Sequence, residues 1–539
     1  QKIMIPHIIR YAVRNKLIIA LFVTVWIGWG VWSLTQLSID AIPDITDNQV
    51  RVITTTPTLA TQEVEQFVTY PVELAMANLP GVKEMRSVSK MGLSVVTIVF
   101  EDDMGTYQPR QLVSEQLETV RENIPSVFGS PSIEPITTGL GEIYQYSLVV
   151  DHEFKDTYDL SELRTIQDWI VRRQLSGIPG VVEINSVGGY VKQYEVAINP
   201  NRLRSMNLTL ENVIRALERN NRNTGGSYVE KGPEALFIRG EGLARSLDDL
   251  ENIVVTTENK IPVLVRDVAD VRFGHAVRYG AMTRNGEGEA VGGQVLMLKG
   301  ENSNKVIDKV KERIAEVQLS LPEGVRIEPF IDRTRLIDKT TSTVTENLVF
   351  GALVVIFFLV LLLGNIRSGL IVASVIPLAM LFAIGMMNLF GISANLMSLG
   401  AIDFGIIIDG AVIIVEFTSY LITSQKSELK SLKGSQLTNR IDQLAEESGS
   451  RMMSSAFFGQ LIILIVFVPI LTLTGVEGKM FQPMAYTFGF AMIGAILLCL
   501  TYVPAASAFF LRPEGRGELK YSQKMVDFLT YRIYRPMIL

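Results

Sequence analysis

The sequence has 539 residues, of which 48% are hydrophobic and 20% charged, and its formal net charge is −6. This composition is too charged for a membrane bundle alone and too apolar for a typical water-soluble protein, so it predicts membrane spans joined to a large aqueous domain. The negative charge argues against a nucleic-acid partner. A single cysteine, Cys499, excludes a disulfide framework within this sequence.

The first span is predicted close to the start of the chain. The sequence begins with Gln1, so we expect that its start has been trimmed. A basic stretch, 2–16, runs into an apolar run of about 20 residues. A cleaved signal peptide would look similar, but no clear small-x-small cleavage site is present. We therefore assign residues 1–37 to a cytoplasmic N-terminus and a retained first span.

The segment after the first span alternates β-rich and helical runs, which predicts an α+β domain made of two similar units. In both units a Pro-Gly pair, at 80–81 or 179–180, ends a helix and starts a strand. The matched order of elements indicates an internal repeat. The alternative is coincidence, since Pro-Gly turns are common. The predicted elements are strand 49–55, helix 61–78, strands 82–90 and 93–100, helix 107–123, then strand 143–150, helix 158–175, and strands 182–187 and 191–198.

Five further apolar stretches are long enough to cross a bilayer as helices. Basic residues beside the spans place both chain ends in the cytoplasm and the domain after the first span outside. The polar segment 423–455 is predicted as a cytoplasmic loop with a helical piece. Residues 513–539 are predicted to hold an amphipathic helix on the cytoplasmic membrane face. The six predicted spans are 17–37, 347–363, 369–390, 396–422, 457–473 and 484–511.

Three acidic residues, Asp403, Asp409 and Glu416, lie in the fourth predicted span. An ionised acid at mid-membrane costs about 2.5–3.5 kcal/mol, so such residues usually face a protein interior and serve transport or proton relay. At about 100° per residue, Asp409 and Glu416 share one helix face, with Asp403 roughly 120° from Asp409. This spacing predicts a ladder of protonatable sites rather than one metal cage. The alternative is that an acid pairs with a basic residue, or that Glu416 reaches the interface.

The pattern of DFG at 403–405, DGA at 409–411 and Val415-Glu416 resembles the resistance–nodulation–division transporters, in particular the divalent-cation type of their heavy-metal efflux branch. One departure is Phe417, where that family usually carries asparagine. The resemblance covers essentially the whole chain but only the N-terminal half of such a transporter, so we expect a fragment or one of two pieces. Supporting stretches are 43–50, 144–146, 187–189 and 331–338.

This resemblance implies an α+β membrane protein with six membrane helices in this half and a large periplasmic α/β-sandwich domain inserted after the first helix. It implies an inner-membrane location in a Gram-negative bacterium and a homotrimer. The implied partners are a periplasmic adaptor, an outer-membrane channel and the missing C-terminal half. The implied domains are a pore subdomain at 38–140, a second at 141–180 with 277–330, a docking subdomain at 181–276, and membrane spans two to six at 331–512.

The implied activity is proton-driven efflux of a divalent metal cation. The stretch 406–408 is Ile-Ile-Ile, whereas the copper and silver branch places methionine around this span. We therefore expect zinc, cobalt, cadmium or nickel as cargo, with zinc foremost and no resident cofactor. Glu142 and Asp168 are candidate metal ligands in the external domain, and the alternative for both is an ordinary solvated acid.

Two alternatives to this hypothesis stay open. The same fold could export drugs or other organic molecules, or it could serve a membrane assembly that does not pump. An ATP-driven engine is not predicted, because Gly478-Lys479 is followed by Met480 and the P-loop pattern fails. No nucleophile–base arrangement predicts an enzyme.

Overall fold

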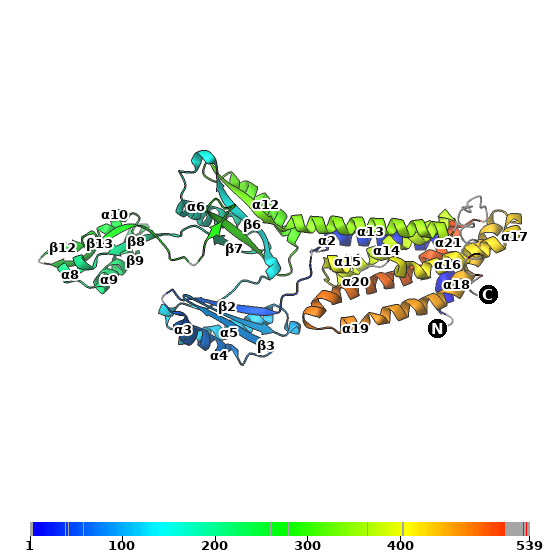
Figure 1. Ribbon diagram of the computed structural model, residues 1–539, viewed down its shortest axis with the longest axis horizontal. Coiled ribbons are helices and arrows are strands. Elements are labelled where there is room, and N and C mark those ends of the chain that lie inside the picture. Colours follow the sequence, from blue (N-terminus) through cyan, green and yellow to red (C-terminus); the bar gives the residue numbers. More distant parts are fainter. Residues whose placement is uncertain are drawn as a thin grey trace. The chain divides into compact units, whose positions relative to one another are not determined.

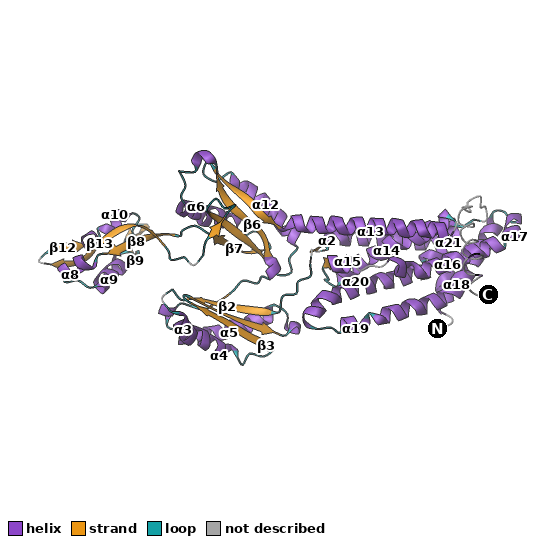
Figure 2. Cartoon of the chain, viewed as in Figure 1, coloured by secondary structure: helices purple, strands orange, loops and turns teal. Residues whose placement is uncertain are grey.

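The protein is described by a computed structural model that covers residues 4–512, apart from 38, 41, 58, 259, 279, 364 and 401–403, together with 532 and 535. It confirms the predicted fold class, because long apolar helices and separate α/β sandwiches share one chain (Figures 1 and 2). The chain divides into two compact units. Unit 1 is Gln1–Gly141, Met297–Ile307 and Arg333–Leu539, and unit 2 is Glu142–Leu296 and Asp308–Asp332. The predicted amphipathic helix at 513–539 lies outside the described residues, apart from 532 and 535.

Unit 1 contains six helices that are long and apolar enough to cross a membrane among the residues described, as predicted. Their lengths are 21 to 37 residues, and the three of 26, 29 and 37 residues exceed the roughly 17–25 residues that a span needs, so these three continue beyond the hydrocarbon core. The candidate spans are Lys16–Gln36, Arg333–Leu361, Ile366–Leu389, Phe404–Ser424, Ser435–Leu471 and Gly475–Leu500.

Helix α2 (Lys16–Gln36) packs tightly against α14 (Ile366–Leu389). A Cβ atom built on Gly30 would lie 2.6 Å from the Cβ of Leu381, so only glycine permits this approach. Trp26 is buried beside it and donates a hydrogen bond of 2.9 Å from Nε1 to the carbonyl oxygen of Leu378. Small residues at such contacts let membrane helices approach closely.

The fourth and sixth predicted spans are each divided in the structure. The fourth is preceded by a separate short helix, α15 (Leu396–Gly400), which Asn395 and Ser398 cap through reciprocal hydrogen bonds. The sixth is split into α20 (Gly475–Leu500) and α21 (Tyr502–Phe510). Proline has no N–H to donate to the carbonyl four residues earlier, so Pro504 cannot continue the hydrogen-bond ladder from Leu500.

The predicted cytoplasmic loop 423–455 is largely helical, which corrects the prediction of a loop with one helical piece. After the short helix α17 (Lys426–Ser431), α18 (Ser435–Val466) runs without interruption from this polar region into the fifth span. A further helix near the start, α1 (Met4–Arg14), was not predicted and packs against α18. Two ion pairs join this part of the chain to α18, Arg10 with Glu446 and Lys16 with Asp442.

The first sandwich of unit 1 matches its predicted elements closely. Its sheet has the order β3-β4-β2-β5. Alternate residues of β2, such as Val50 and Val52, are buried, as β-branched side chains on a half-buried strand should be. They share a core with a stripe on α5 that includes Val113 and Leu117. The bounds are β2 Gln49–Thr55, β3 Val82–Lys90, β4 Leu93–Phe100, β5 Ser132–Ile133 and α5 Tyr107–Asn123; α3 Thr61–Val64 and α4 Tyr70–Met76 flank a π-helical turn, Glu65–Thr69.

Unit 2 repeats part of this plan. Its first helix again contains a π-helical turn, Gln167–Val171, between α6 (Leu160–Ile166) and α7 (Arg172–Leu175). Both Pro-Gly joints place the glycine at positive φ, 73° at Gly81 and 94° at Gly180, which glycine adopts without strain. These features support the predicted internal repeat.

The strand that follows β7 does not pair as the repeat predicted. Strand β8 (Lys192–Ile198) lies antiparallel to β13 (Ala269–His275) in a separate sheet. The main sheet of unit 2 instead has the order β14-β15-β6-β16, with β7 (Val181–Val187) on β15. Its other strands are β6 Glu142–Val150, β14 Met282–Thr283, β15 Glu289–Met297 and β16 Val325–Asp332, and α12 (Ser303–Gln318) connects β15 to β16.

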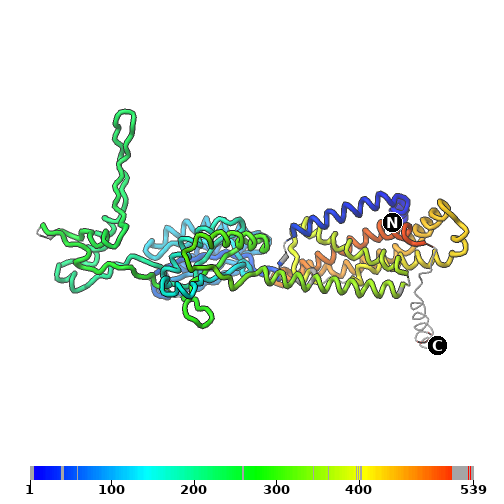
Figure 3. The backbone as a smooth tube through the Cα atoms, turned by 90° about the horizontal axis from the view of Figure 1, so that it is seen from above, coloured from blue at the N-terminus to red at the C-terminus, as the bar shows by residue number. Residues whose placement is uncertain are grey.

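Between β8 and β13 the chain forms a compact helical and strand cluster with one long hairpin. The cluster contains α8 (Pro200–Ser205), α9 (Leu210–Asn220) and α10 (Leu247–Glu251), and the hairpin is β9 (Thr224–Lys231) with β10 (Glu234–Gly240). Figure 3 shows the hairpin as a green arm extending from its neighbouring segments. All residues of both strands are exposed, including Phe237 at 82%.

Candidate functional site

Helix α16 (Phe404–Ser424) carries two of the three acids singled out in the sequence, Asp409 and Glu416. Its apolar residues form a helix that packs on α14, α18 and α20. One side of it is buried in a continuous stripe, with Ile407, Ala411, Ile414 and Val415 fully buried. This burial fixes the rotation of the helix, so the side chains opposite that stripe have a defined direction.

The opposite face of α16 is exposed and carries two carboxylates. Asp409 and Glu416 both lie on it, as the helical spacing predicted, and they alternate with Ile413 and Tyr420, which are 41% and 64% exposed. The third predicted residue, Asp403, lies outside the described residues. The face is therefore acidic at two points two turns apart and apolar between them.

The residue that departs from the family pattern, Phe417, has a clear environment. It is half-buried, and the guanidinium carbon of Arg451 on α18 lies 5.8 Å from the centre of its ring. That distance is within the range of a cation–π contact. Phe417 thus brings a positive charge to the turn of α16 that follows Glu416.

Gln460 on α18 was missed in the sequence, although it is the lone polar side chain in residues 457–471 of the predicted span 457–473. It is 2% exposed, and its carboxamide lies against Gly410 of α16. A buried amide in an apolar span is costly, so a polar residue standing alone in such a run was the available signal.

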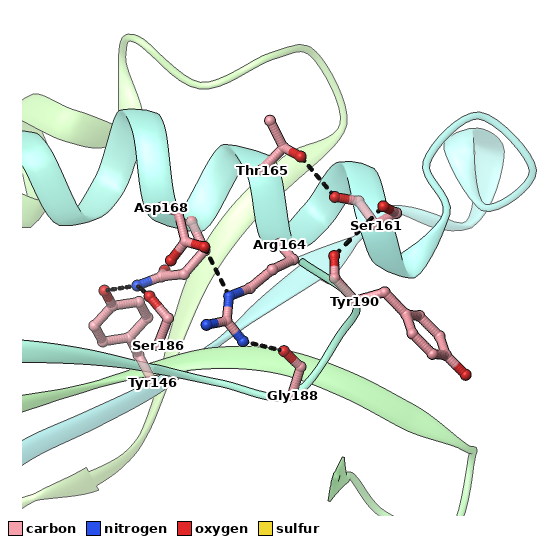
Figure 4. A network of polar contacts seen from close by, with 9 residues as sticks. Tyr146, Ser161, Arg164, Thr165, Asp168, Ser186, Gly188 and Tyr190 are labelled. Carbon is pink, nitrogen blue, oxygen red and sulfur yellow. Dashed lines mark hydrogen bonds and ion pairs between the residues drawn. The ribbon is translucent and has the colours of Figure 1, made fainter. Parts of the chain in front are cut away.

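Asp168, a predicted metal ligand, lies in a polar network of unit 2 that Figure 4 shows in detail. Its Oδ2 accepts a hydrogen bond of 2.9 Å from Nε of Arg164, one helical turn earlier, and Arg164 also donates to the carbonyl oxygen of Gly188. Its other oxygen, Oδ1, is buried and has no hydrogen-bond partner among the described residues. The carboxylate is therefore neutralised on one side and unsatisfied on the other.

Two neighbouring side chains of this network come from the sheet, Tyr146 on β6 and Ser186 on β7, and both lie near Gln167 of the π-helical turn. Gln167 donates from Nε2 to the hydroxyl oxygen of Tyr146, 3.1 Å away, and lies 3.4 Å from Oγ of Ser186 (Figure 4). Burial raises the pKa of Tyr146 above its ordinary value, and the Gln167 hydrogen bond opposes that rise. Tyr146 is therefore a neutral hydroxyl that ties the helix to β6.

Glu142, the other predicted ligand, is the exposed first residue of β6, and its Oε2 accepts a hydrogen bond of 3.1 Å from Gln145. Within the part of the chain that the structure describes, no three His, Cys, Asp or Glu side chains gather closely enough to hold a metal ion. Glu142 and Asp168 thus do not complete a cage with a third such residue here, and their metal role stays a prediction.

The chain is similar to known transport proteins along most of its length. The profile of the AcrB/AcrD/AcrF family matches residues 8–538. The chain is 47% identical over 514 residues to a cation efflux system protein, CzcA, of Alcaligenes sp., covering 94% of this chain and 48% of that protein. It is 46% identical over the same length to the cobalt-zinc-cadmium resistance protein CzcA of Cupriavidus metallidurans, again with coverage of 94% and 48%.

A solved structure supports the same relationship. The X-ray crystal structure of a heavy metal efflux pump is 35% identical and superposes with a TM-score of 0.81, covering 92% of this chain and 48% of that one. The chain thus spans about half the length of the relatives it matches.

Proposed function

Because the chain belongs to the AcrB/AcrD/AcrF family, within the heavy-metal efflux branch of the resistance–nodulation–division transporters, we propose that it is the N-terminal half of a proton-driven efflux pump for divalent heavy-metal cations. The pump acts as a secondary active transporter, a cation/proton antiporter, and has no resident cofactor. It sits in the inner membrane of a Gram-negative bacterium as part of a tripartite assembly.

The observation that carries this proposal is the acidic face of α16. Asp409 and Glu416 stand on an exposed face of a helix that is otherwise buried among apolar helices. Lipid would not tolerate two ionised carboxylates there, at about 2.5–3.5 kcal/mol each near the bilayer centre. We infer that the rest of the full-length protein covers this face. Carboxyl groups enclosed in this way bind and release protons as the covering helices move, with Asp403 as the third member of the relay.

The cargo is inferred from the relatives and from the donor atoms available. One matching relative is named for resistance to cobalt, zinc and cadmium. Carboxylate oxygens suit such divalent ions better than thioether sulfur does. The unsatisfied Oδ1 of Asp168 supports a ligand role in unit 2, which Glu142 would share, with the remaining ligands supplied by the second half. Zinc is the foremost candidate.

The β9–β10 hairpin supports a homotrimer. Two-stranded hairpins are marginally stable by themselves in water, and this one exposes Tyr228, Leu236 and Phe237. Such an arm fits a role in holding subunits together. The segment 181–276 that contains it would be the docking subdomain, where a periplasmic adaptor and an outer-membrane channel complete the assembly. The pore subdomains would be 38–140 and 141–180 with 277–330.

Metal tolerance tests the proposal in cells that lack their own exporters. The cells would carry the full-length gene, either intact or with Asp409→Asn, and would be challenged with zinc, cobalt, nickel, cadmium, copper and an organic dye. We expect the intact gene to protect against divalent metals and Asp409→Asn to abolish protection, because an amide cannot carry the proton. Glu416→Gln should weaken protection.

The matched control is Ile413→Val, which alters the same exposed face without touching a charge. It should protect like the intact gene at equal protein level. Protection against dye alone would overturn the metal cargo, and full protection by Asp409→Asn would overturn the proton-coupled engine.

A further inference from the structure

An apolar groove of about 430 Å³ lies between the start of α2 and helix α21. This volume is within the range of pockets that hold a small ligand. Three alanines, Ala20 of α2 with Ala505 and Ala506 of α21, line the groove, and their side chains are too short to fill it. Its described lining contains no acidic residue, so the groove suits an apolar occupant.

The groove is held open by contacts that do not depend on an occupant. The hydroxyl oxygen of Tyr502 lies 2.8 Å from Oγ of Ser374 on α14, so the polar atom of this lining residue already has a partner. Phe509 and Phe510 pack edge to face, with ring centres 4.9 Å apart, and both remain exposed. Large exposed aromatic side chains beside a hollow indicate a surface that binds another molecule.

The groove occupies only one end of these membrane helices. On α2 its lining extends from Lys16 to Ala20, which is roughly 6 Å of helix at 1.5 Å per residue. The basic residues that flank the spans assign this end of α2 to the cytoplasmic side. The groove therefore lies at the level where the head groups and the acyl chains of the cytoplasmic leaflet meet.

Positive charge gathers at the cytoplasmic end of the groove. Arg14 ends α1 and Arg512 follows α21, and each is two residues away from a lining residue, or within about 7 Å along the chain. Both side chains are exposed and make no ion pair with the part of the chain that the structure describes. Lys16, by contrast, is paired with Asp442. An apolar hollow with unpaired cations at one end complements a molecule that is apolar along its body and anionic at one end.

We propose that the groove between α2 and α21 binds an acyl chain of an anionic phospholipid from the cytoplasmic leaflet, with the lipid phosphate at Arg14 and Arg512. Basic pockets between membrane helices on the cytoplasmic side are typical sites for anionic head groups. The bound chain covers the alanines and the two phenylalanine rings, and the phosphate joins the end of α1 to the end of α21. This inference depends on the membrane location of the chain and not on its cargo or on proton coupling.

Native mass spectrometry tests the head-group part of this proposal. The full-length protein is delipidated in detergent and titrated with phosphatidylglycerol or phosphatidylethanolamine that carry the same acyl chains. We expect phosphatidylglycerol to bind about tenfold or more tightly, because only its head group carries a net negative charge. Arg14→Gln and Arg512→Gln should each weaken it about fivefold and leave phosphatidylethanolamine unchanged. The matched control is Arg367→Gln, at an exposed cation on α14 outside the groove, which should change neither lipid.

A larger side chain in the groove tests the acyl-chain part. Ala20 is exposed, so Ala20→Phe fills the groove without disturbing the buried core. It should weaken both lipids about tenfold, because the ring takes the room of two or more methylene groups. Leu21→Phe, at the next exposed position and outside the groove, should bind both lipids like the intact protein. Phosphatidylglycerol with a photoreactive diazirine on one acyl chain should label the peptide that contains Tyr502–Phe510.

Three results would overturn the assignment. Equal binding of the two lipids would remove the role of the arginines. No bound lipid in the intact protein would mean that the rest of the full-length protein covers the groove. Labelling that misses Tyr502–Phe510, or unchanged binding in Ala20→Phe, would place the lipid elsewhere. The proposed function survives each of these results, because metal tolerance is measured separately.

Discussion

At the scale of single residues, the Tyr146 hydroxyl group joins two elements of unit 2. It accepts the hydrogen bond of Gln167, whose Oε1 is already buried without a partner among the described residues. Tyr146→Phe would remove this acceptor at nearly constant volume. We expect a loss of about 1–2 kcal/mol of local stability, because a buried donor loses its partner.

Hydrogen exchange of the β6 amides in the full-length protein measures this change. The β6 segment should exchange faster in Tyr146→Phe, and the matched control Tyr228→Phe, on the exposed hairpin, should leave β6 unchanged. Equal protection of β6 in the intact protein and in Tyr146→Phe would show that the hydrogen bond contributes nothing.

At the scale of elements, two glycines of α2 make a matched pair. A side chain at Gly30 would meet Leu381 of α14 at 2.6 Å, whereas nothing lies within 4 Å of a Cβ at Gly28. We expect Gly30→Ala to destabilise the helix pair by about 1–3 kcal/mol through overpacking. Gly28→Ala should be neutral or slightly stabilising, because alanine favours the helix by roughly 1 kcal/mol over glycine.

The two variants are compared by the midpoint temperature of thermal unfolding, measured on the full-length protein purified in detergent. Gly30→Ala should unfold at a lower temperature than Gly28→Ala. Equal midpoints would mean that α2 and α14 separate easily enough to admit a methyl group.

Some helices and strands could be predicted from the sequence, and others could not. Strand bounds such as 49–55 and 82–90 were predicted to the residue, because alternation and the Pro-Gly joints are local signals. The pairing of β8 with β13 was not predicted, because the paired residues Ile198 and Ala269 are 71 positions apart in the sequence and no local pattern encodes their contact. The shared face of Asp409 and Glu416 followed from helical geometry. The position of Gln460 on Gly410 depends on packing between helices and could not be derived from spacing.

At the scale of the whole molecule, the β9–β10 hairpin should govern assembly. Phe237 is 82% exposed on β10, and we expect Phe237→Ser to weaken association of the full-length subunits, because an interface would lose a large apolar contact. Mass measurement of the detergent-purified protein over a dilution series checks this. The proposed trimer should dissociate at a concentration about tenfold or more higher in the variant than in the intact protein.

The control for assembly is Leu319→Ser, at another strongly exposed apolar position of unit 2. Its dissociation should match that of the intact protein. If Phe237→Ser also assembles normally, the hairpin does not hold subunits together.

The continuous helix α18 has a mechanical consequence. Its 32 residues make a stiff rod about 48 Å long. The ion pairs of Arg10 with Glu446 and Lys16 with Asp442 attach the N-terminal segment to the first half of this helix, and Gln460 lies in its second half. A tilt of about 10° about these ion pairs would swing the far end by roughly 5 Å, given 20 residues at 1.5 Å each. A rotation of α18 about these ion pairs would therefore displace its far end, where it meets the acidic helix, more than the end that lies beside α1.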